Sequence, residues 1–487
     1  MVMAIPICLL MFVFLAFIPL RLNKPEIKRI DDVAEYVAGE REKLGSLSRA
    51  EKNTLIAFGI TVTLWILPGI VALIAGTDSD AYGFGLHAAG VDAAERDRVR
   101  VRGRADHHHD PIRRNVRHRG RDPDHHFPAV DGEPARVGRM SSIAVIPGDG
   151  IGTEVITSAR AVLDAVADRH GISLSYTEFD WSCQRYAREG AMMPADGIDT
   201  LRGFDAILLG AVGWPGVPDH VSLWGLLIPI RRAFRQYVNL RPIKVFEGVE
   251  SPLRAPGEVD FVVVRENVEG EYSEVGGRLN RGFPDEMAVQ ESVFTRVGVS
   301  RIADYALELA RKRRGHVTSA TKSNGIVHTL PFWDEVVAER ALHFPDVRMD
   351  SEHIDALAAK FVLQPQRFDV VVGSNLFGDI LSDLAAAVAG SIGIAPSANL
   401  DPTKEFPSMF EPVHGSAPDI AGRGIANPVG AVWSAALMLE HLGHHEAAGE
   451  VLAAMESTLA KPETRTADLG GSASTAEVTE ALVAQLG

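Results

Sequence analysis

Two aspartates stand four positions apart in the segment FGDILSD, as Asp379 and Asp383. If this segment is helical, the spacing places both carboxylates on one face of the helix. Two like charges at that separation repel each other unless a cation lies between them, and oxygen ligands favour Mg²⁺ or Mn²⁺ over zinc. The spacing also fits two solvent-facing acids near a helix start, where aspartate is favoured. The pair alone leaves both interpretations open.

Three arginines lie in or beside apolar segments, as Arg231 in IRRAF, Arg241 in NLRP and Arg265 in VVVREN. Guanidinium groups bind carboxylates through paired hydrogen bonds, so arginines that converge on one pocket indicate a di- or triacid substrate. A charged group beside a buried strand is costly unless it is paired. Surface arginines are common, however, and no single one is identified as a ligand by its position.

A possible acid and base follow from two further segments. Lys322 ends the strand-like run HVTSATKSN, and Tyr272 lies in EGEYSEV. A lysine whose pKa is lowered by burial or nearby cations can act as a general base, and a tyrosine can act as the matching acid. Each residue is equally compatible with an ordinary surface or packing role.

The elements that must position these residues begin abruptly at Met140. Residues 141–146 form a short apolar strand, a Gly-rich turn follows, and an amphipathic helix is expected to end at Gly171. Further buried-strand runs cover residues 204–213, 259–267 and 368–375. Strands that alternate with helices predict an α/β protein with a largely parallel sheet.

The Gly-rich turn at residues 148–152 invites a dinucleotide interpretation. Its spacing is GxGxG rather than GxGxxG, so the motif is weak evidence for a nucleotide site. Glycines at these positions serve a tight strand-to-helix turn equally well.

Composition excludes some classes of function. The chain of 487 residues carries 64 acidic and 49 basic residues, for a net charge of -15. This balance argues against nucleic-acid binding. The only cysteines, Cys8 and Cys183, exclude a disulfide framework, suit a reducing compartment and do not form a zinc motif.

The first 139 residues differ from the rest. Residues 1–20 and 54–76 are almost wholly apolar, and each is about as long as the roughly 20 residues that cross a bilayer. Residues 1–76 are therefore predicted to hold two transmembrane helices, and part of this region resembles a fragment of a sodium-coupled dicarboxylate or sulfate transporter. We expect a fragment joined by gene fusion or an incorrect gene model; a genuine two-helix anchor and buried soluble helices are the alternatives. Residues 77–139, rich in Arg, His, Asp and Pro, are predicted to be a disordered or out-of-frame linker.

From Met140 to Gly487 the chain resembles the isocitrate/isopropylmalate dehydrogenase family of metal-dependent, β-decarboxylating oxidoreductases. The segments that carry the resemblance are, in order, PGDGIGTEV, NLRP, VVVRENVEGEY, TKSN, NLFGDILSDL and FEPVHGSAPDIAGRGIANP. The resemblance implies a two-domain α/β fold with a central, largely parallel sheet that is not a conventional Rossmann fold, preceded by two apolar helices. Residues 140–236 and 390–487 would form the cofactor-binding domain, and residues 237–389 the substrate, metal and dimerisation domain.

The resemblance also implies a role for each candidate residue. Arg231, Arg241 and Arg265 match the arginines that hold the substrate carboxylates, with Asn324 near the junction of cofactor and substrate. Lys322 and Tyr272 match the base and the acid. Asp355, Asp379 and Asp383 match the ligands of Mn²⁺ or Mg²⁺. In this family the lysine and the first of these aspartates come from the partner subunit, which implies a homodimer with shared sites. His414, Gly415, Ala417, Asp419 and Asn427 match the cofactor-binding residues.

Further residues indicate which cofactor and which substrate this member of the family would use. Asp419 can accept hydrogen bonds from ribose hydroxyls and would repel a 2′-phosphate, which implies NAD rather than NADP. The segments FDWSCQRYAREGAMMP and QESVFTRVGVSRI are most similar to the branch of the family that oxidises and decarboxylates D-malate or tartrate. The alternatives are activity on 3-isopropylmalate or homoisocitrate and, from another class, a membrane transport fragment with a soluble appendage. The apolar stretch at residues 224–228 is an ambiguous cue to the substrate. The enzyme domain is expected in the cytoplasm, with membrane attachment only if residues 1–76 are present in the native protein.

Overall fold

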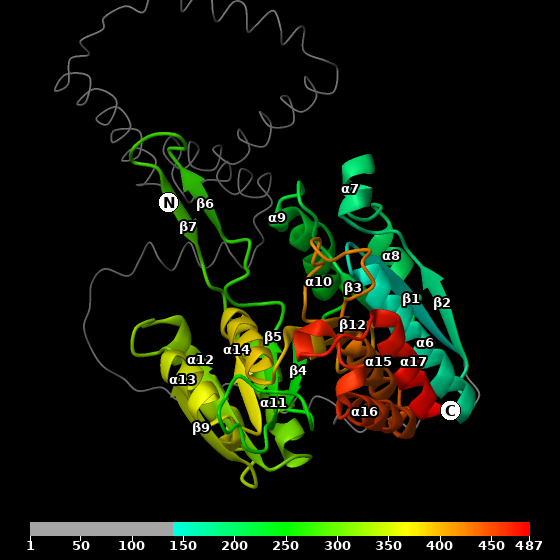
Figure 1. Cartoon of the computed structure of the whole chain (residues 1–487). Coiled ribbons are helices and arrows are strands. Elements are labelled where there is room, and N and C mark those ends of the chain that lie inside the picture. Colours follow the sequence, from blue (N-terminus) through cyan, green and yellow to red (C-terminus); the bar gives the residue numbers. More distant parts are fainter. Residues whose placement is uncertain (1–139) are drawn as a thin grey trace, which may run out of the picture. The chain divides into compact units, whose positions relative to one another are not determined.

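The computed structural model describes residues 140–487 (Figure 1). The predicted transmembrane helices in residues 1–76 and the linker in residues 77–139 lie outside these described residues. Within residues 140–487, no helix is both long enough and apolar enough to cross a membrane.

A ten-stranded sheet forms the centre of the described chain, in the order β2-β1-β3-β12-β11-β4-β5-β10-β8-β9. Its strands are β1 (Ser141–Gly148), β2 (Leu174–Glu178), β3 (Ala206–Ala211), β4 (Val238–Lys244), β5 (Asp260–Glu266), β8 (His316–Thr321), β9 (Arg348–His353), β10 (Val370–Gly373), β11 (Pro396–Leu400) and β12 (Ser408–Pro412). Both flanks are parallel, which confirms the predicted largely parallel sheet. The central pairs β12–β11, β11–β4 and β4–β5 are antiparallel, so the two flanks run in opposite directions.

Helices cover both faces of the flank that contains β1. Ile143 and Val145 belong to one core and Ala144 and Ile146 to another, because successive residues of a strand point to opposite faces. One face carries α6 (Gly152–His170), α15 (Val429–His441), α16 (His445–Leu459) and α17 (Thr475–Leu486). The other carries α7 (Cys183–Glu189), α8 (Gly197–Leu201), α9 (Asp219–Ser222), the π-helix η1 (Leu223–Leu227) and α10 (Ile228–Ala233).

The predicted first helix is present as α6, and it ends where the sequence indicates. Gly171 follows it with φ of 64°, in the left-handed conformation that glycine adopts without steric cost. The backbone N–H of Gly171 contacts the carbonyl oxygens of Ala167 and Asp168. Carbonyl groups in the last turn of a helix have no N–H partner within the helix, so this contact supplies one.

The other flank of the sheet is also covered on both faces. Helices α11 (Arg296–Arg311) and α12 (Thr329–Ala341) pack against β8, and α11 also packs against β5 and β10. Helix α14 (Asn375–Val388) packs against β4, β5 and β10, with α13 (Ile354–Leu363) beside it. Short 3₁₀ turns complete the chain: η2 (Pro365–Arg367), η3 (Ile392–Ile394), η4 (Pro462–Thr464) and η5 (Ala467–Leu469).

A hairpin of β6 (Gly276–Leu279) and β7 (Met287–Gln290) forms a separate two-stranded sheet, and every residue of both strands is exposed. Figure 1 shows it extending away from the large sheet. Leu279, Phe283 and Met287 expose 59%, 67% and 48% of their surface. We call the β6–β7 hairpin the arm. A lone hairpin with exposed apolar side chains has marginal stability in water, so the arm is expected to pack against a surface that residues 140–487 of one chain do not provide.

The predicted division into residues 140–236 with 390–487, and residues 237–389, cuts across the large sheet. Strand β11 of the first set pairs with β4 of the second, through Ala398 and Leu240 among others. The sheet is therefore continuous through both predicted domains, and the division itself stays a prediction.

Candidate active site

Helix α14 carries the two aspartates that the spacing places on one helical face. Its N-cap is Ser374, whose side chain accepts a hydrogen bond from the N–H of Phe377. Arg241, on β4, lies opposite: one of its terminal nitrogens is 3.3 Å from Oδ1 of Asp379, and the other is 3.3 Å from Oδ1 of Asp383. Strand β4 and helix α14 thus place the Arg241 guanidinium within ion-pair distance of both carboxylates.

All three predicted arginines are buried, and each has an acidic or polar partner. Arg231 pairs with Glu411 at 2.7 Å, whereas Arg265 pairs with Asp379. Arg241 also donates to Oγ of Ser382 at 2.6 Å. Burial lowers the pKa of Arg265 to about 10. The negative charge of Asp379 acts to raise this pKa, whereas the positive charges of Arg241 and Arg231 lower it further. Arg241 and Arg265 both contact Asp379. We call the three arginines, together with Asp379 and Asp383, the substrate cluster.

Two donors of the substrate cluster have no acceptor within the described part of the chain. Nε of Arg231 and Nε of Arg241 are both buried and lack a hydrogen-bond partner there. A buried donor without a partner costs about 1–3 kcal/mol. An anionic ligand with two carboxylates would offer acceptors to both.

Tyr272 completes one side of the substrate cluster. Its hydroxyl donates to Oδ2 of Asp379 at 3.0 Å, and the Arg265 guanidinium lies 5.5 Å from the centre of its ring. Burial, and then the charge of Asp379, raise the pKa of Tyr272 above its usual value, although Arg265 opposes this. The phenol therefore stays protonated at neutral pH, as a proton donor requires.

The two aspartates differ in their pKa values. Burial acts to raise the pKa of Asp379, but the charges of Arg265 and Arg241 outweigh it and hold that pKa below the ordinary value. Burial raises the pKa of Asp383, and Arg241 offsets this only in part while Asp379 adds to it. A cation between the carboxylates would favour the charged form of both.

Lys322 and Asp355 form a second group. The Lys322 ammonium is 2.8 Å from Oδ1 of Asp355, and its hydrogen bond lowers the pKa of that carboxyl. Asp355 exposes 68% of its side chain, and Asn324 is exposed in the turn after β8. Among residues 140–487, no three His, Cys, Asp or Glu side chains lie together as a metal site would require. The single chain therefore brings Asp379 and Asp383 together without adding Asp355.

The predicted cofactor residues lie on the segment 414–427 after β12, which we call the cofactor loop. Ala417 has a positive φ of 39°, which is uncommon for a residue with a side chain. Asp419 is exposed, whereas Asn427 is buried and donates to Oδ2 of Asp468 at 3.0 Å. Burial lowers the pKa of His414, and its Nε2 is buried without a partner in the described region. Burial therefore favours the neutral form of the His414 ring.

The Gly-rich turn supports the cofactor loop. The N–H of Ile151 donates to the carbonyl oxygen of Ser416 at 2.9 Å, and a Cβ on Gly150 would overlap that same oxygen. Glu154, in the first turn of α6, accepts hydrogen bonds from the N–H groups of Gly422 at 2.6 Å and Gly424 at 3.1 Å. The glycines that suggested a nucleotide motif therefore permit close packing of two backbone segments.

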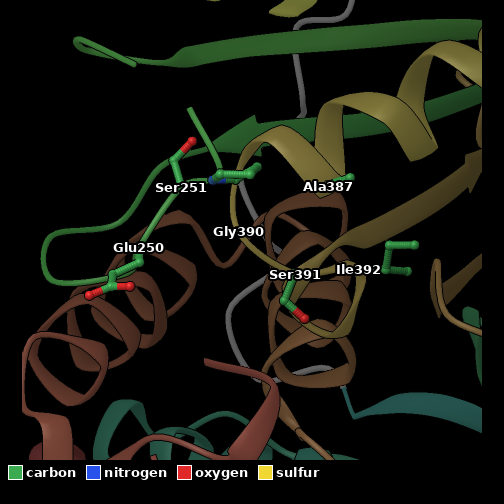
Figure 2. Close-up of a pocket in the computed structure, with 7 residues that line it drawn as sticks. Glu250, Ser251, Ala387, Gly390, Ser391 and Ile392 are labelled. Carbon is green, nitrogen blue, oxygen red and sulfur yellow. The ribbon is translucent and has the colours of Figure 1, made fainter. Parts of the chain in front are cut away.

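An open pocket of about 540 Å³ lies one helical turn beyond Asp383 along α14. Figure 2 shows its lining, with Glu250 and Ser251 on one segment and Ser391 and Ile392 on another. None of the predicted site residues lines it. The hydroxyl of Ser251 donates to the carbonyl oxygen of Val388 at 2.7 Å, which ties the segment before the pocket to the end of α14. The three predicted arginines do not line this pocket.

Two residues of the site, Glu411 and Asn375, were not predicted from the sequence. Glu411 holds Arg231 and also accepts from Nδ2 of Asn399 at 2.7 Å, and Asn375 accepts from Nε and Nη2 of Arg265 at 3.1 and 2.7 Å. These partners lie more than 100 residues from the arginines that they contact. No local pattern identifies them, although both belong to the segments that carry the family resemblance.

Buried arginines that face the partly exposed aspartates of α14, beside a mixed sheet, are typical of an α/β enzyme for small anionic substrates. The chain belongs to the isocitrate/isopropylmalate dehydrogenase family, whose profile matches residues 142–482. It is 56% identical over 346 residues to a probable tartrate dehydrogenase/decarboxylase of Bacillus subtilis, covering 71% of this chain and 97% of that protein. It is 55% identical over 350 residues to the decarboxylating D-malate dehydrogenase of Escherichia coli, covering 70% and 97%.

Solved structures agree with this assignment. The isocitrate dehydrogenase of Methylococcus capsulatus is similar with a TM-score of 0.66 and 34% identity, covering 71% of this chain and 99% of that one. The predicted family resemblance is therefore confirmed. Residues 1–83 match the transmembrane region of sodium:sulfate symporters, which confirms the resemblance noted for the N-terminal part.

Proposed function

We propose that the chain catalyses the NAD-dependent oxidation, with decarboxylation, of D-malate, tartrate or both to 2-oxo acids. The observation that carries this proposal is the pair of buried, unpartnered Nε donors of Arg231 and Arg241, of which Arg241 also contacts the carboxylates of Asp379 and Asp383. The names of the relatives, a tartrate dehydrogenase/decarboxylase and a decarboxylating D-malate dehydrogenase, support the choice of substrate.

The charges of the site fit a dicarboxylate together with a divalent metal. Three arginines face three acids, Asp379, Asp383 and Glu411, so the region is close to neutral. A dianionic substrate and a divalent cation that bind together preserve this balance, whereas either one alone leaves buried charge uncompensated. Asp379 and Asp383 offer the oxygen donors that Mg²⁺ and Mn²⁺ prefer, and would hold the ion.

The cofactor loop fits NAD. Asp419 is exposed, so its carboxylate is available to ribose hydroxyls and repels a 2′-phosphate. His414 presents a neutral ring, since burial lowers its pKa. Gly415, Ala417 and Asn427 would contact the rest of the cofactor.

The residues of the chain divide the chemistry among them. When bound, NAD accepts hydride from C2 and the metal supplies positive charge that favours ionisation of the hydroxyl and of the later enol oxygen. Arg231, Arg241 and Arg265 bind and orient the two carboxylates of the substrate. Lys322 takes the proton of the C2 hydroxyl as the 2-oxo acid forms.

Loss of CO₂ leaves a carbon that must be protonated. The C3 carboxylate departs with its bonding electrons left on the substrate, and Tyr272 then donates its phenolic proton to C3. The raised pKa of Tyr272 keeps that proton in place until this step. D-Malate and NAD⁺ would thus give pyruvate, CO₂ and NADH.

A homodimer supplies what a single chain lacks. Lys322 and Asp355 pair with each other and not with Asp379 and Asp383, so the complete site needs these two groups from a partner copy. Exposed apolar residues of the arm, such as Phe283 and Leu279, provide a surface that a second copy would bury.

Product analysis tests the proposal. With purified full-length protein, NAD and Mn²⁺, each D-malate consumed should yield one NADH, one pyruvate and one CO₂. NADH formation that leaves all the carbon as an undecarboxylated 2-oxo diacid would refute the decarboxylating step. No NADH formation from either D-malate or tartrate would refute the substrate assignment.

A further inference from the structure

Glu271 immediately precedes the proposed acid Tyr272, and its carboxylate binds the start of the helix that carries the acid pair. Oε1 accepts from the hydroxyl of Ser374 at 2.8 Å, and Oε2 accepts from the N–H of Leu376 at 3.0 Å. The first N–H groups of a helix have no partner within the helix, and a negative charge there is favourable. One side chain thus anchors both the N-cap and the first turn of α14.

The next residue contacts the same helix one turn later. The Tyr272 hydroxyl donates to Asp379, and Asp379 follows Leu376 by three residues. Two adjacent residues of one segment therefore bind α14 at two successive turns. This double attachment limits sliding and rotation of the helix relative to Tyr272, because either motion would break one of the two contacts.

Asn375 extends the attachment to the substrate arginine. Its Nδ2 donates to the carbonyl oxygen of Glu269 at 3.0 Å, and its Oδ1 receives two hydrogen bonds from Arg265. Asn375 exposes only 2% of its surface. The first turn of α14 is consequently held by the same segment that presents Arg265 and Tyr272.

We propose that Glu271 is a positioning residue that sets the distance between the Tyr272 hydroxyl and the Asp379 carboxylate. Its carboxylate binds Ser374 and Leu376 and fixes α14, so that the acid and the metal ligand stay in register. This inference rests on the proposed roles of Tyr272 and Asp379. It adds that the affinity for metal and the protonation step depend on one common side chain.

Glu271→Gln tests this assignment, because the amide offers one acceptor where the carboxylate offers two and places an N–H group against a donor. The expected result is a fall in kcat for D-malate and a weaker Kd for Mn²⁺, each by about 10- to 100-fold, with KM for NAD unchanged. Mn²⁺ binding is measured by electron paramagnetic resonance on the full-length protein without substrate. Hydrogen exchange should show faster exchange of the amides of residues 374–379.

Glu291→Gln is the matched control, since Glu291 is an exposed glutamate that directly follows β7. It should behave as the unmodified protein in all four measurements. If Glu271→Gln keeps both kcat and the Kd for Mn²⁺ within twofold of the unmodified protein, the positioning role is wrong. An equal loss in NAD binding with a fall in Tm would also contradict it, because it would indicate general damage to the fold.

The metal measurement separates this inference from the proposed function. If the unmodified protein fails to oxidise D-malate, the proposed function fails. A weakened Mn²⁺ Kd and faster exchange in Glu271→Gln would still support the positioning of Asp379 in that case. Glu271→Ala provides a second variant, in which both acceptors are lost and the loss of Mn²⁺ affinity should be at least as large.

Discussion

The substrate cluster and the cofactor loop are held in place by different kinds of contact. In the substrate cluster, buried charged side chains such as Arg241 and Arg265 are held by further side chains from distant segments. In the cofactor loop, backbone groups carry the contacts: Glu154 and Ile151 hold the loop through peptide N–H and carbonyl groups. Under the proposed function, substrate binding would depend on charged side chains at fixed positions, whereas cofactor binding would depend on a loop whose backbone is held in one shape.

The largest effect is expected from Asp383→Asn. Asp383 exposes 55% of its side chain and makes one contact with Arg241 at 3.3 Å, so the fold should survive its neutralisation. Metal-dependent turnover of D-malate should fall below detection, because one oxygen ligand loses its charge. The measurement is NADH formation over a titration of Mn²⁺, with circular dichroism as the control for folding. Near-normal activity at ordinary Mn²⁺ would refute the metal role.

Arg241→Gln should separate the two regions. Removing one partner of a buried charge pair typically costs 2–5 kcal/mol, so kcat/KM for D-malate should fall by about 10³-fold. NADH binding, followed by the change in its fluorescence, should match that of the unmodified protein. Equal losses for the dicarboxylate and for NADH would show that the two regions are not separate.

A smaller effect is expected in the cofactor loop. Glu154→Gln removes one of two charge-assisted hydrogen bonds to the loop, and KM for NAD should rise about tenfold, since such bonds contribute roughly 1.5–3 kcal/mol. The value of kcat should change little. Asp168→Asn, an exposed substitution on the same helix, is the control. A loss confined to kcat would contradict the supporting role of Glu154.

The last prediction concerns stability at acid pH rather than activity, on the cofactor side of the molecule. Burial lowers the pKa of His441 to about 3. The group thus contributes stability that is fully present above its unfolded pKa of 6.5 and is lost as pH falls toward 3. Chemical unfolding at pH 7.5 and pH 5 should differ by about 2 kcal/mol more in the unmodified protein than in His441→Asn. An identical pH dependence in both would show that His441 titrates normally.

Sequence patterns predicted the parts of this molecule that depend on short-range spacing. The four-residue separation of Asp379 and Asp383 requires only a helix, and that helix is present as α14. The end of α6 at Gly171 likewise depends on one residue. The short motifs also identified the family, because they occur in the same order along the chain as in other members.

Contacts between distant segments could not be predicted in the same way. Glu411 reaches Arg231 across 180 positions, because helix α10 and strand β12 meet in one apolar core that holds Ile230 and Met409. The Gly-rich turn was ambiguous because glycine is required in two cases that look alike in a sequence. In one case the backbone approaches a ligand, and in the other it approaches another backbone segment, as Gly150 does here. The proposed roles of Lys322 and Asp355 depend on a second copy of the chain, which no pattern within one chain specifies.

The central claim is that the full-length protein oxidises a small 2-hydroxy diacid with NAD. Initial rates of NADH formation with Mn²⁺ should be compared for D-malate, (+)-tartrate, 3-isopropylmalate and isocitrate. The account predicts turnover of D-malate or tartrate, with kcat/KM well above that for the two larger acids and for NADP in place of NAD. Turnover of 3-isopropylmalate alone would contradict it.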